Sequence, residues 1–250
     1  MAPSPNHAGS HSKWLAIFYR PAFAYITILI FQFKRIWGLW NYRDLPLGDT
    51  PHYFTYACEW YRHLHVGLAW SPLYTAFYGS FLNFSHDAYL VTNLHRVVLV
   101  LLAAALVLAV FRQLLPHPIA WLTAAWWSVL SVNHNAPYEV HVFALLPDLI
   151  AWLVILRGSG PWSRGIGLAI FLGATFLVRN ELIVAVVCWA GMCLLREWTS
   201  RRAAPVGKTL PLLRVSLAYA LPAAMACLVV GWFYSRAIVK GADLATEVEL

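Results

Sequence analysis

Long apolar stretches alternate with short polar ones along most of the chain. A helix needs about 20 apolar residues to cross roughly 30 Å of hydrocarbon, and seven segments approach that length. These segments are residues 14–33, 92–111, 119–132, 141–156, 165–178, 182–195 and 210–234. Several are shorter than a full span, which is typical of tilted helices inside a bundle. The pattern predicts an all-α integral membrane protein with about seven transmembrane helices.

One further apolar segment, residues 71–84, decides the topology. Its 14 residues would form a helix only about 21 Å long, so it either crosses the membrane or lies flat at the interface. If it lies flat, ten of the eighteen Lys and Arg residues fall on the cytoplasmic side, and after residue 90 the split is eight inside against four outside. The positive-inside rule requires such an excess of basic residues on the cytoplasmic side. We therefore predict a flat segment, a cytoplasmic tail at residues 1–13 and a single transmembrane domain over residues 14–250.

The first outer loop, residues 34–91, is long, and loops of this length are usually functional or disordered. Its apolar positions at helical spacing are Tyr53, Ala57, Trp60 and Leu64. The polar positions between them are His52, Thr55, Glu59, Arg62 and His63. This alternation is the pattern of an amphipathic helix that lies on a membrane. We predict interfacial amphipathic helices in this loop.

Composition and charge support the same class of protein. Hydrophobic residues make up 60% of the chain and charged residues 12%, and the mean hydropathy is +0.61, values outside the range of soluble domains. The net charge of +7 fits an excess of basic residues in cytoplasmic loops better than a nucleic-acid partner. The four cysteines form no CxxC pair, so neither a disulfide framework nor a zinc site is predicted.

The first candidate for chemistry is Asp49, in the string Gly48-Asp49-Thr50-Pro51. This string is typical of a helix start, with Asp49 or Thr50 as N-cap and Pro51 in the first turn. Asp49 is also a carboxylate expected at the outer boundary of the bilayer, where it can act as a general base. The two interpretations are compatible. His52, which follows Pro51, is a supporting candidate.

The second outer loop ends in Glu139 and His141, after a run rich in Asn. It is either an ordinary solvated turn or a pair of ligands for a divalent cation, the one candidate cofactor. Asp148 stands deeper in the following apolar segment, next to Pro147. A charge near the bilayer centre costs roughly 3 kcal/mol or more, so such a residue generally faces a polar cavity or a partner.

A third polar element, Arg179-Asn180-Glu181, interrupts what would otherwise be about 30 apolar residues in a row. One continuous helix would bury these three residues at a cost of several kcal/mol, whereas a helical hairpin with its tip outside avoids that cost. Two interpretations of the tip stay open. Arg179 either pairs locally with Glu181 or holds a phosphate at the interface.

At these positions the chain resembles the GT-C-type membrane glycosyltransferases that use polyprenyl-phosphate sugar donors, the superfamily of the protein O-mannosyltransferases and the aminoarabinose lipid A transferases. The matching strings are Gly48-Asp49-Thr50-Pro51-His52-Tyr53, Trp70-Ser71-Pro72-Leu73-Tyr74, residues 93–96 with the span that follows and Tyr138-Glu139, and Leu177-Val178-Arg179-Asn180-Glu181. They look like the family's acidic motif, its stretch before an interfacial helix, its second segment and its short hairpin. The likeness covers roughly residues 14–241.

The resemblance implies a GT-C-like module that transfers a sugar, with inversion, from a polyprenyl-phosphate donor to a lipid, glycan or protein acceptor. It implies Asp49 as catalytic base, Glu139 as a second acidic residue and Arg179 as a contact of the donor phosphate, supported by His52, His141, Asp148 and Glu181. The expected location is a cell inner membrane or the endoplasmic reticulum. The N-terminus is expected in the cytoplasm and the active face outside or in the lumen.

The chain departs from the family in two places. Asn180 stands where proline is frequent, and the sequence ends at Leu250, where family members usually continue with further spans. A minimal enzyme, a truncated product and one part of a larger assembly are all consistent with this. The alternatives are a non-catalytic scaffold subunit and a lipid or solute transporter, in which Asp148 and Arg179 line a path. A transporter would favour internal repeats, and the sequence shows none.

Overall fold

The computed structural model describes residues 19–36, 49–68, 70–130, 133, 139–203 and 212–238, and all regular structure within these ranges is helical. The helices are α2 (Pro21–Ile36), α3 (Thr50–His63), α4 (Pro72–Ser80), η3 (Phe81–Asn83), α5 (Ala88–Leu114), α6 (His117–Ser128), α7 (Glu139–Arg157), α8 (Pro161–Leu177), η6 (Asn180–Leu182), α9 (Ile183–Ala203) and α10 (Leu212–Ile238). The predicted all-α class is confirmed for these residues.

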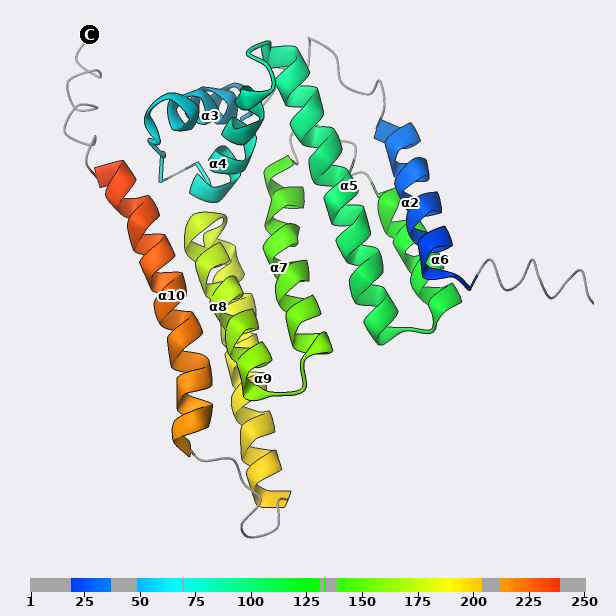
Figure 1. The fold of residues 1–250 in the computed structure, drawn as a ribbon, viewed down its shortest axis with the longest axis vertical. Helices are drawn as coiled ribbons and strands as arrows, with labels where there is room; N and C mark the ends of the chain where they lie inside the picture. The colour runs from blue at the N-terminus through cyan, green and yellow to red at the C-terminus, as the bar shows by residue number, and fades with distance from the viewer. Residues whose placement is uncertain are drawn as a thin grey trace, which may run out of the picture.

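The long helices lie side by side, and α3 and α4 lie across one end of the bundle, called here the α3–α4 end (Figure 1). Helix α5 packs against α2, α6 and α7, and α8 packs against α7, α9 and α10. Successive long helices run in opposite directions. The start of α7 and the ends of α8 and α10 therefore reach the α3–α4 end, where α10 contacts the α3 layer through Phe233, stacked on Trp60 at 5.6 Å.

Within the described ranges, three helices are long and apolar enough to cross a membrane, by length and composition: Ala88–Leu114, Glu139–Arg157 and Leu213–Arg236. They contain most of three predicted segments, and they indicate a membrane protein. Helices α2, α6, α8 and α9 correspond to the other four segments. In the described part of the chain α2, α6 and α8 have 16, 12 and 17 residues, or about 24, 18 and 26 Å. Their role as spans stays a prediction.

Helix α3 forms where the sequence predicts an amphipathic helix. Ala57 on its apolar face is fully buried, Tyr53 and Trp60 are partly buried, and His52 on the other face is exposed. The placement of Leu64 on the apolar face was wrong. Leu64 follows the last turn with a φ of 51° and is 43% exposed, because the chain leaves the helix at this residue.

The predicted flat segment, residues 71–84, folds into the nine-residue helix α4 and the short turn η3. Nine helical residues span only about 14 Å, too little to cross a bilayer. Helix α4 lies beside α3 rather than among the long helices (Figure 1). This arrangement agrees with the flat placement that the distribution of basic residues favours.

Two close contacts fix the α3–α4 layer. A Cβ atom on Gly79 of α4 would lie 2.6 Å from the carbonyl oxygen of Ala57 in α3, so only glycine lets the two backbones approach this closely. Ser71 precedes α4, and its hydroxyl donates a hydrogen bond of 2.6 Å to the carbonyl oxygen of Val178, just after α8. The layer is thereby joined to the end of α8.

Candidate functional site at the α3–α4 end

Asp49 occupies the N-cap position of α3. Its carbonyl oxygen accepts a hydrogen bond of 3.0 Å from the Tyr53 backbone, but its carboxylate makes no capping hydrogen bond, and the residue is exposed. The predicted N-cap position is therefore confirmed, while the side-chain bond that usually goes with it is not formed. The helix does not use this carboxylate.

Glu139 begins α7 and is held by a buried guanidinium. Arg96 of α5 is 1% exposed, its Nε donates to Glu139 Oε1 at 2.9 Å, and its Nη2 pairs with the same oxygen. The buried hydroxyl of Thr50 accepts from Arg96 Nη2 at 3.3 Å and donates to Glu139 Oε1 at 3.4 Å. Because Thr50 directly follows Asp49, this network joins α5 and α7 to the start of α3.

Arg179, Glu181 and His141 form a second polar group at the same end of the bundle. Arg179 donates from Nη2 to Glu181 Oε1 at 2.7 Å and from Nε to Oε2 at 3.2 Å, a bidentate pair. Its Nη1 donates to His141 Nε2 at 3.2 Å, because a guanidinium has no acceptor. The hydrogen bond from Arg179 lowers the pKa of Glu181 to about 2. The predicted hairpin is confirmed, and the local ion pair, one of the two open interpretations of Arg179, is present.

Charged residues from both polar groups act on the pKa of Tyr53, in the first turn of α3. Burial raises the pKa of its hydroxyl, a hydrogen bond with Ser71 lowers it, and the charges of Asp49, Arg179 and Glu139 each act on it. Contacts place the three charged candidates at the same end of the bundle. Thr50, the neighbour of Asp49, donates a hydrogen bond to Glu139, and His141, two residues after Glu139, contacts Arg179.

An aromatic wall flanks the first turn of α3. His52 stacks on Trp70 with ring centroids 4.9 Å apart, and Tyr53 packs edge-on against the same indole at 5.4 Å. Tyr53 also packs edge-on against Tyr74 of α4 at 4.9 Å. Edge-on and offset aromatic pairs of this kind hold one another in place. His52 and Tyr53 of this wall lie three and four residues after Asp49 in the sequence.

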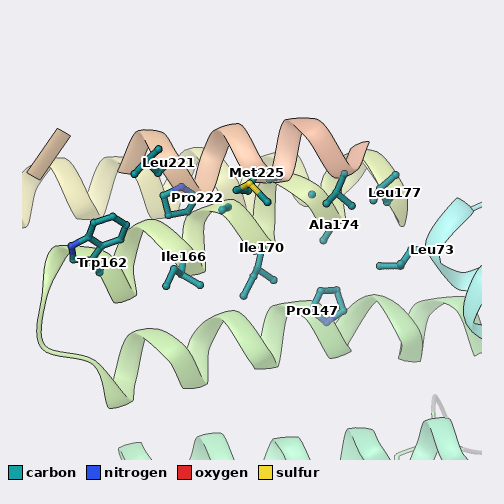
Figure 2. A pocket seen from close by; sticks show the side chains of 14 residues that line it. Leu73, Pro147, Trp162, Ile166, Ile170, Ala174, Leu177, Leu221, Pro222 and Met225 are labelled. Atoms are coloured by element: carbon teal, nitrogen blue, oxygen red, sulfur yellow. The ribbon is translucent and has the colours of Figure 1, made fainter. Parts of the chain in front are cut away.

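An apolar groove of about 580 Å³ runs between α7, α8 and α10 (Figure 2). Leu73 and Leu177 line the end nearest α4, Pro147 lines one side, and Trp162 lies at the far end. Fifteen residues of α8 separate Leu177 from Trp162, a length of about 22 Å. Leu177 is two residues from Arg179, so the groove ends close to the second polar group.

The structure does not bring every candidate together. Asp148 lies nine residues after Glu139 on α7, about 14 Å further along the helix, and its buried Oδ1 has no hydrogen-bond partner. Glu139 and His141, the predicted cation pair, are each engaged by a different arginine. In the part of the chain that the structure describes, no group of three or more His, Cys, Asp or Glu residues is placed to hold a metal ion.

The network around Arg96 was not predicted from the sequence. One signal was present, because a charged residue in an apolar helix needs a partner. Nothing in the sequence identified that partner as Glu139, 43 residues away. The groove gave no signal either, since it forms from three helices whose contacts depend on tertiary packing.

Comparisons of the chain with known protein families, with characterised proteins and with solved structures find no match. Its function is therefore inferred from the two polar groups, the carboxylate of Asp49 and the groove.

Proposed function

We propose that the chain is the transmembrane module of a GT-C-type glycosyltransferase, which transfers a sugar from a polyprenyl-phosphate donor to an acceptor with inversion. One juxtaposition carries the proposal. The apolar groove ends two residues from Arg179. Arg179 contacts His141, and Glu139, two residues before His141, accepts a hydrogen bond from Thr50, the neighbour of Asp49. A lipid-linked sugar phosphate requires an apolar channel, a cation at its mouth and a carboxylate near that cation.

The donor binds with its prenyl chain in the groove and its phosphate at Arg179. The side chains of Arg179 and Glu181 are 30% and 68% exposed, and exposed ion pairs are weak. The phosphate can therefore replace the Glu181 carboxylate on the guanidinium at little cost. His141 keeps its contact with Nη1 and holds the guanidinium in place during this exchange.

Transfer then proceeds by direct displacement. Asp49 takes the proton of the acceptor hydroxyl while the acceptor oxygen attacks the anomeric carbon from the face opposite the phosphate. The bond between this carbon and the phosphate oxygen breaks, and its electron pair leaves with the prenyl phosphate. Arg179 stabilises the charge that develops on the departing phosphate. Attack from the opposite face inverts the configuration of the sugar.

Glu139 serves this reaction as a positioning residue rather than as a second base. Its Oε1 is occupied by Arg96 and Thr50, so it fixes Thr50 and thereby the neighbouring Asp49. The exposed ring of His52, stacked on Trp70, offers a flat surface beside Asp49 on which a sugar ring can pack.

The proposal includes seven spans, a cytoplasmic N-terminus and an α3–α4 end that faces outward or into the lumen. The supporting argument is the distribution of Lys and Arg, which favours the cytoplasm for the opposite end. The membrane is a cell inner membrane or the endoplasmic reticulum. The acceptor is a lipid, glycan or protein that reaches the α3–α4 end.

The test is sugar transfer from a labelled polyprenyl-phosphate donor, compared between wild type and Asp49→Asn at matched expression. Loss of a general base lowers the rate by about 100-fold or more. Asp87→Asn is the matched control, because Asp87 caps α5 through a 2.7 Å bond from Leu90 N and asparagine caps equally well. We expect this control to keep wild-type activity. Equal rates for wild type and Asp49→Asn would rule out the assigned base.

The groove alone also favours a lipid transporter, the second candidate. A transporter would bind prenyl phosphate and move it across the membrane, with no sugar released, and Asp49→Asn would leave this movement unchanged. A non-catalytic scaffold would release no sugar and move no lipid. The same labelled donor therefore separates the three functions.

A further inference from the structure

A cavity of about 400 Å³ lies at the α3–α4 end, between α3 and the segment that leads into α5. Its lining residues are Phe54, Cys58, Tyr61 and Arg62 of α3, Leu82 of η3, and His86 just before α5. The spacing of the α3 residues explains the wall they form. Phe54, Cys58 and Tyr61 follow one another at intervals of four and three residues, so they share one face of the helix.

The lining divides into an apolar floor and a polar rim. On the floor, Leu82 is 4% exposed and Phe54 and Cys58 are partly buried. On the rim, Tyr61, Arg62 and His86 are exposed. The rings of Tyr61 and His86 meet edge-on with centroids 5.6 Å apart, so the rim is held together across the two segments.

Arg62 gives the cavity a positive character. Burial raises the pKa of the Cys58 thiol on the floor, and two charges act on the same thiol. Arg62, which lowers the pKa, has a larger effect than Glu59, which raises it. In the described part of the chain, Arg62 and Glu59 form no ion pair. The carboxylate of Asp87, next to His86, accepts a 2.7 Å hydrogen bond from the backbone of α5. The cation therefore dominates at the floor, which favours an anionic ligand.

Exposed apolar side chains lie beside the cavity. Phe84, between the two lining residues Leu82 and His86 in the sequence, is 77% exposed, and Leu90 in the first turn of α5 is 54% exposed. Helix α5 is long and apolar enough to cross a membrane, and the cavity lies next to its first residues. A cation beside exposed apolar side chains at the end of such a helix is the arrangement that a lipid headgroup and its acyl chain require.

We propose that this cavity binds the phosphate of an anionic membrane phospholipid, with Arg62 and His86 as donors to the phosphate oxygens and an acyl chain along the adjacent apolar surface. A guanidinium matches the geometry of phosphate, and an imidazole N–H is a second donor. Cys58 lies nine residues after Asp49, about 14 Å further along α3. The site therefore does not depend on the sugar-transfer chemistry.

The test is photo-crosslinking of the full chain in a neutral detergent with phosphatidylglycerol that carries a diazirine in one acyl chain, followed by mapping of the crosslinked peptides. We expect crosslinks in residues 81–90. Arg62→Gln should reduce them about tenfold, because a hydrogen bond to a charged group is lost, and His86→Gln should reduce them several-fold. The matched controls are Arg236→Gln and His63→Gln, which replace exposed basic residues outside the cavity near the same end. Both should keep the wild-type yield.

Arg62 is exposed, so its substitution tests binding without disturbing the fold, and His86→Gln tests the site from the other segment. Equal crosslinking of residues 81–90 in wild type and in either variant would overturn the site. Phosphatidylcholine with the same diazirine should crosslink about tenfold less, because its choline adds a positive charge beside Arg62. Equal yields from the two lipids would overturn the role of the anionic headgroup. Displacement of the crosslinks by inorganic phosphate at the concentration of the lipid would overturn the lipid and leave a free anion as the ligand.

Discussion

At the scale of single residues, two ion pairs among the described residues of the α3–α4 end differ in burial. The side chains of Arg96 and Glu139 are 1% and 10% exposed, whereas those of Arg179 and Glu181 are 30% and 68% exposed. A buried charge that loses its partner is strongly destabilising, while an exposed pair contributes little. The first pair therefore supports the fold, and the second can exchange its carboxylate for a ligand.

The buried pair gives a stability prediction. Glu139→Gln removes the carboxylate that pairs with the buried Arg96 guanidinium, and we expect the free energy of unfolding to fall by about 3–5 kcal/mol. Glu181→Gln, which removes the exposed carboxylate, should cost less than about 1 kcal/mol. Denaturant unfolding in detergent micelles measures both. Similar losses for the two variants would contradict the structural role of Arg96.

The sequence identified Asp49, Glu139 and Arg179 one by one, because charged residues between apolar stretches stand out. It could not give their partners. Arg96 is 43 residues from Glu139 and His141 is 38 residues from Arg179, so these contacts depend on how the helices pack.

At the scale of elements, hydrophobic spacing located most of the helices, and the polar residues 179–181 located the tip of the α8–α9 hairpin. The hydrophobic spacing extended the predicted helix past its end, to Leu64, because periodicity does not show where a chain leaves a helix. The groove could not be predicted. Pro147 and Pro222, prolines inside α7 and α10, both line it, but only the packing of these helices against α8 shows that they share a surface.

The crossing of α3 over α4 gives the second stability prediction. Gly79→Ala places a Cβ atom 2.6 Å from the Ala57 carbonyl oxygen and 2.9 Å from the Trp60 ring, and we expect a loss of about 1–3 kcal/mol from this overpacking. Gly231→Ala in α10 is the control, because a Cβ atom there meets nothing within 4 Å. Thermal unfolding of both variants measures the difference. An unchanged midpoint for Gly79→Ala would contradict the close approach.

At the scale of the whole molecule, the bundle has two unlike ends. The α3–α4 end carries Asp49 and the Arg179 group, and the opposite end carries Arg112, Arg157 and Arg214. The class of protein followed from composition and periodicity, because apolar helices of membrane length are visible in a sequence. The number of spans and their orientation remain predictions.

This topology can be tested with single cysteines in sealed vesicles, after alanine replaces the four native cysteines Cys58, Cys188, Cys193 and Cys227. His86→Cys, before α5, and Ser159→Cys, between α7 and α8, introduce thiols at exposed positions near opposite ends of the bundle. We expect a membrane-impermeant maleimide to label one from outside and the other only after permeabilisation. Labelling of both from the same side would contradict the topology.

The central claim is that the groove carries the lipid chain of a sugar donor to the site at the α3–α4 end. Gly173 lines the groove, and a Cβ atom there meets nothing within 4 Å, so we expect the side chain of Gly173→Trp to begin in open space and occupy the groove. Gly191 on α9 is equally open and lies outside the groove.

The most direct measurement is the rate at which labelled sugar leaves a polyprenyl-phosphate donor in wild type, Gly173→Trp and Gly191→Trp. We predict that Gly173→Trp slows the release at least about tenfold, which corresponds to a loss of about 1.4 kcal/mol of donor binding, and that Gly191→Trp stays at the wild-type rate. Release at the wild-type rate with the groove filled by Gly173→Trp would contradict the claim.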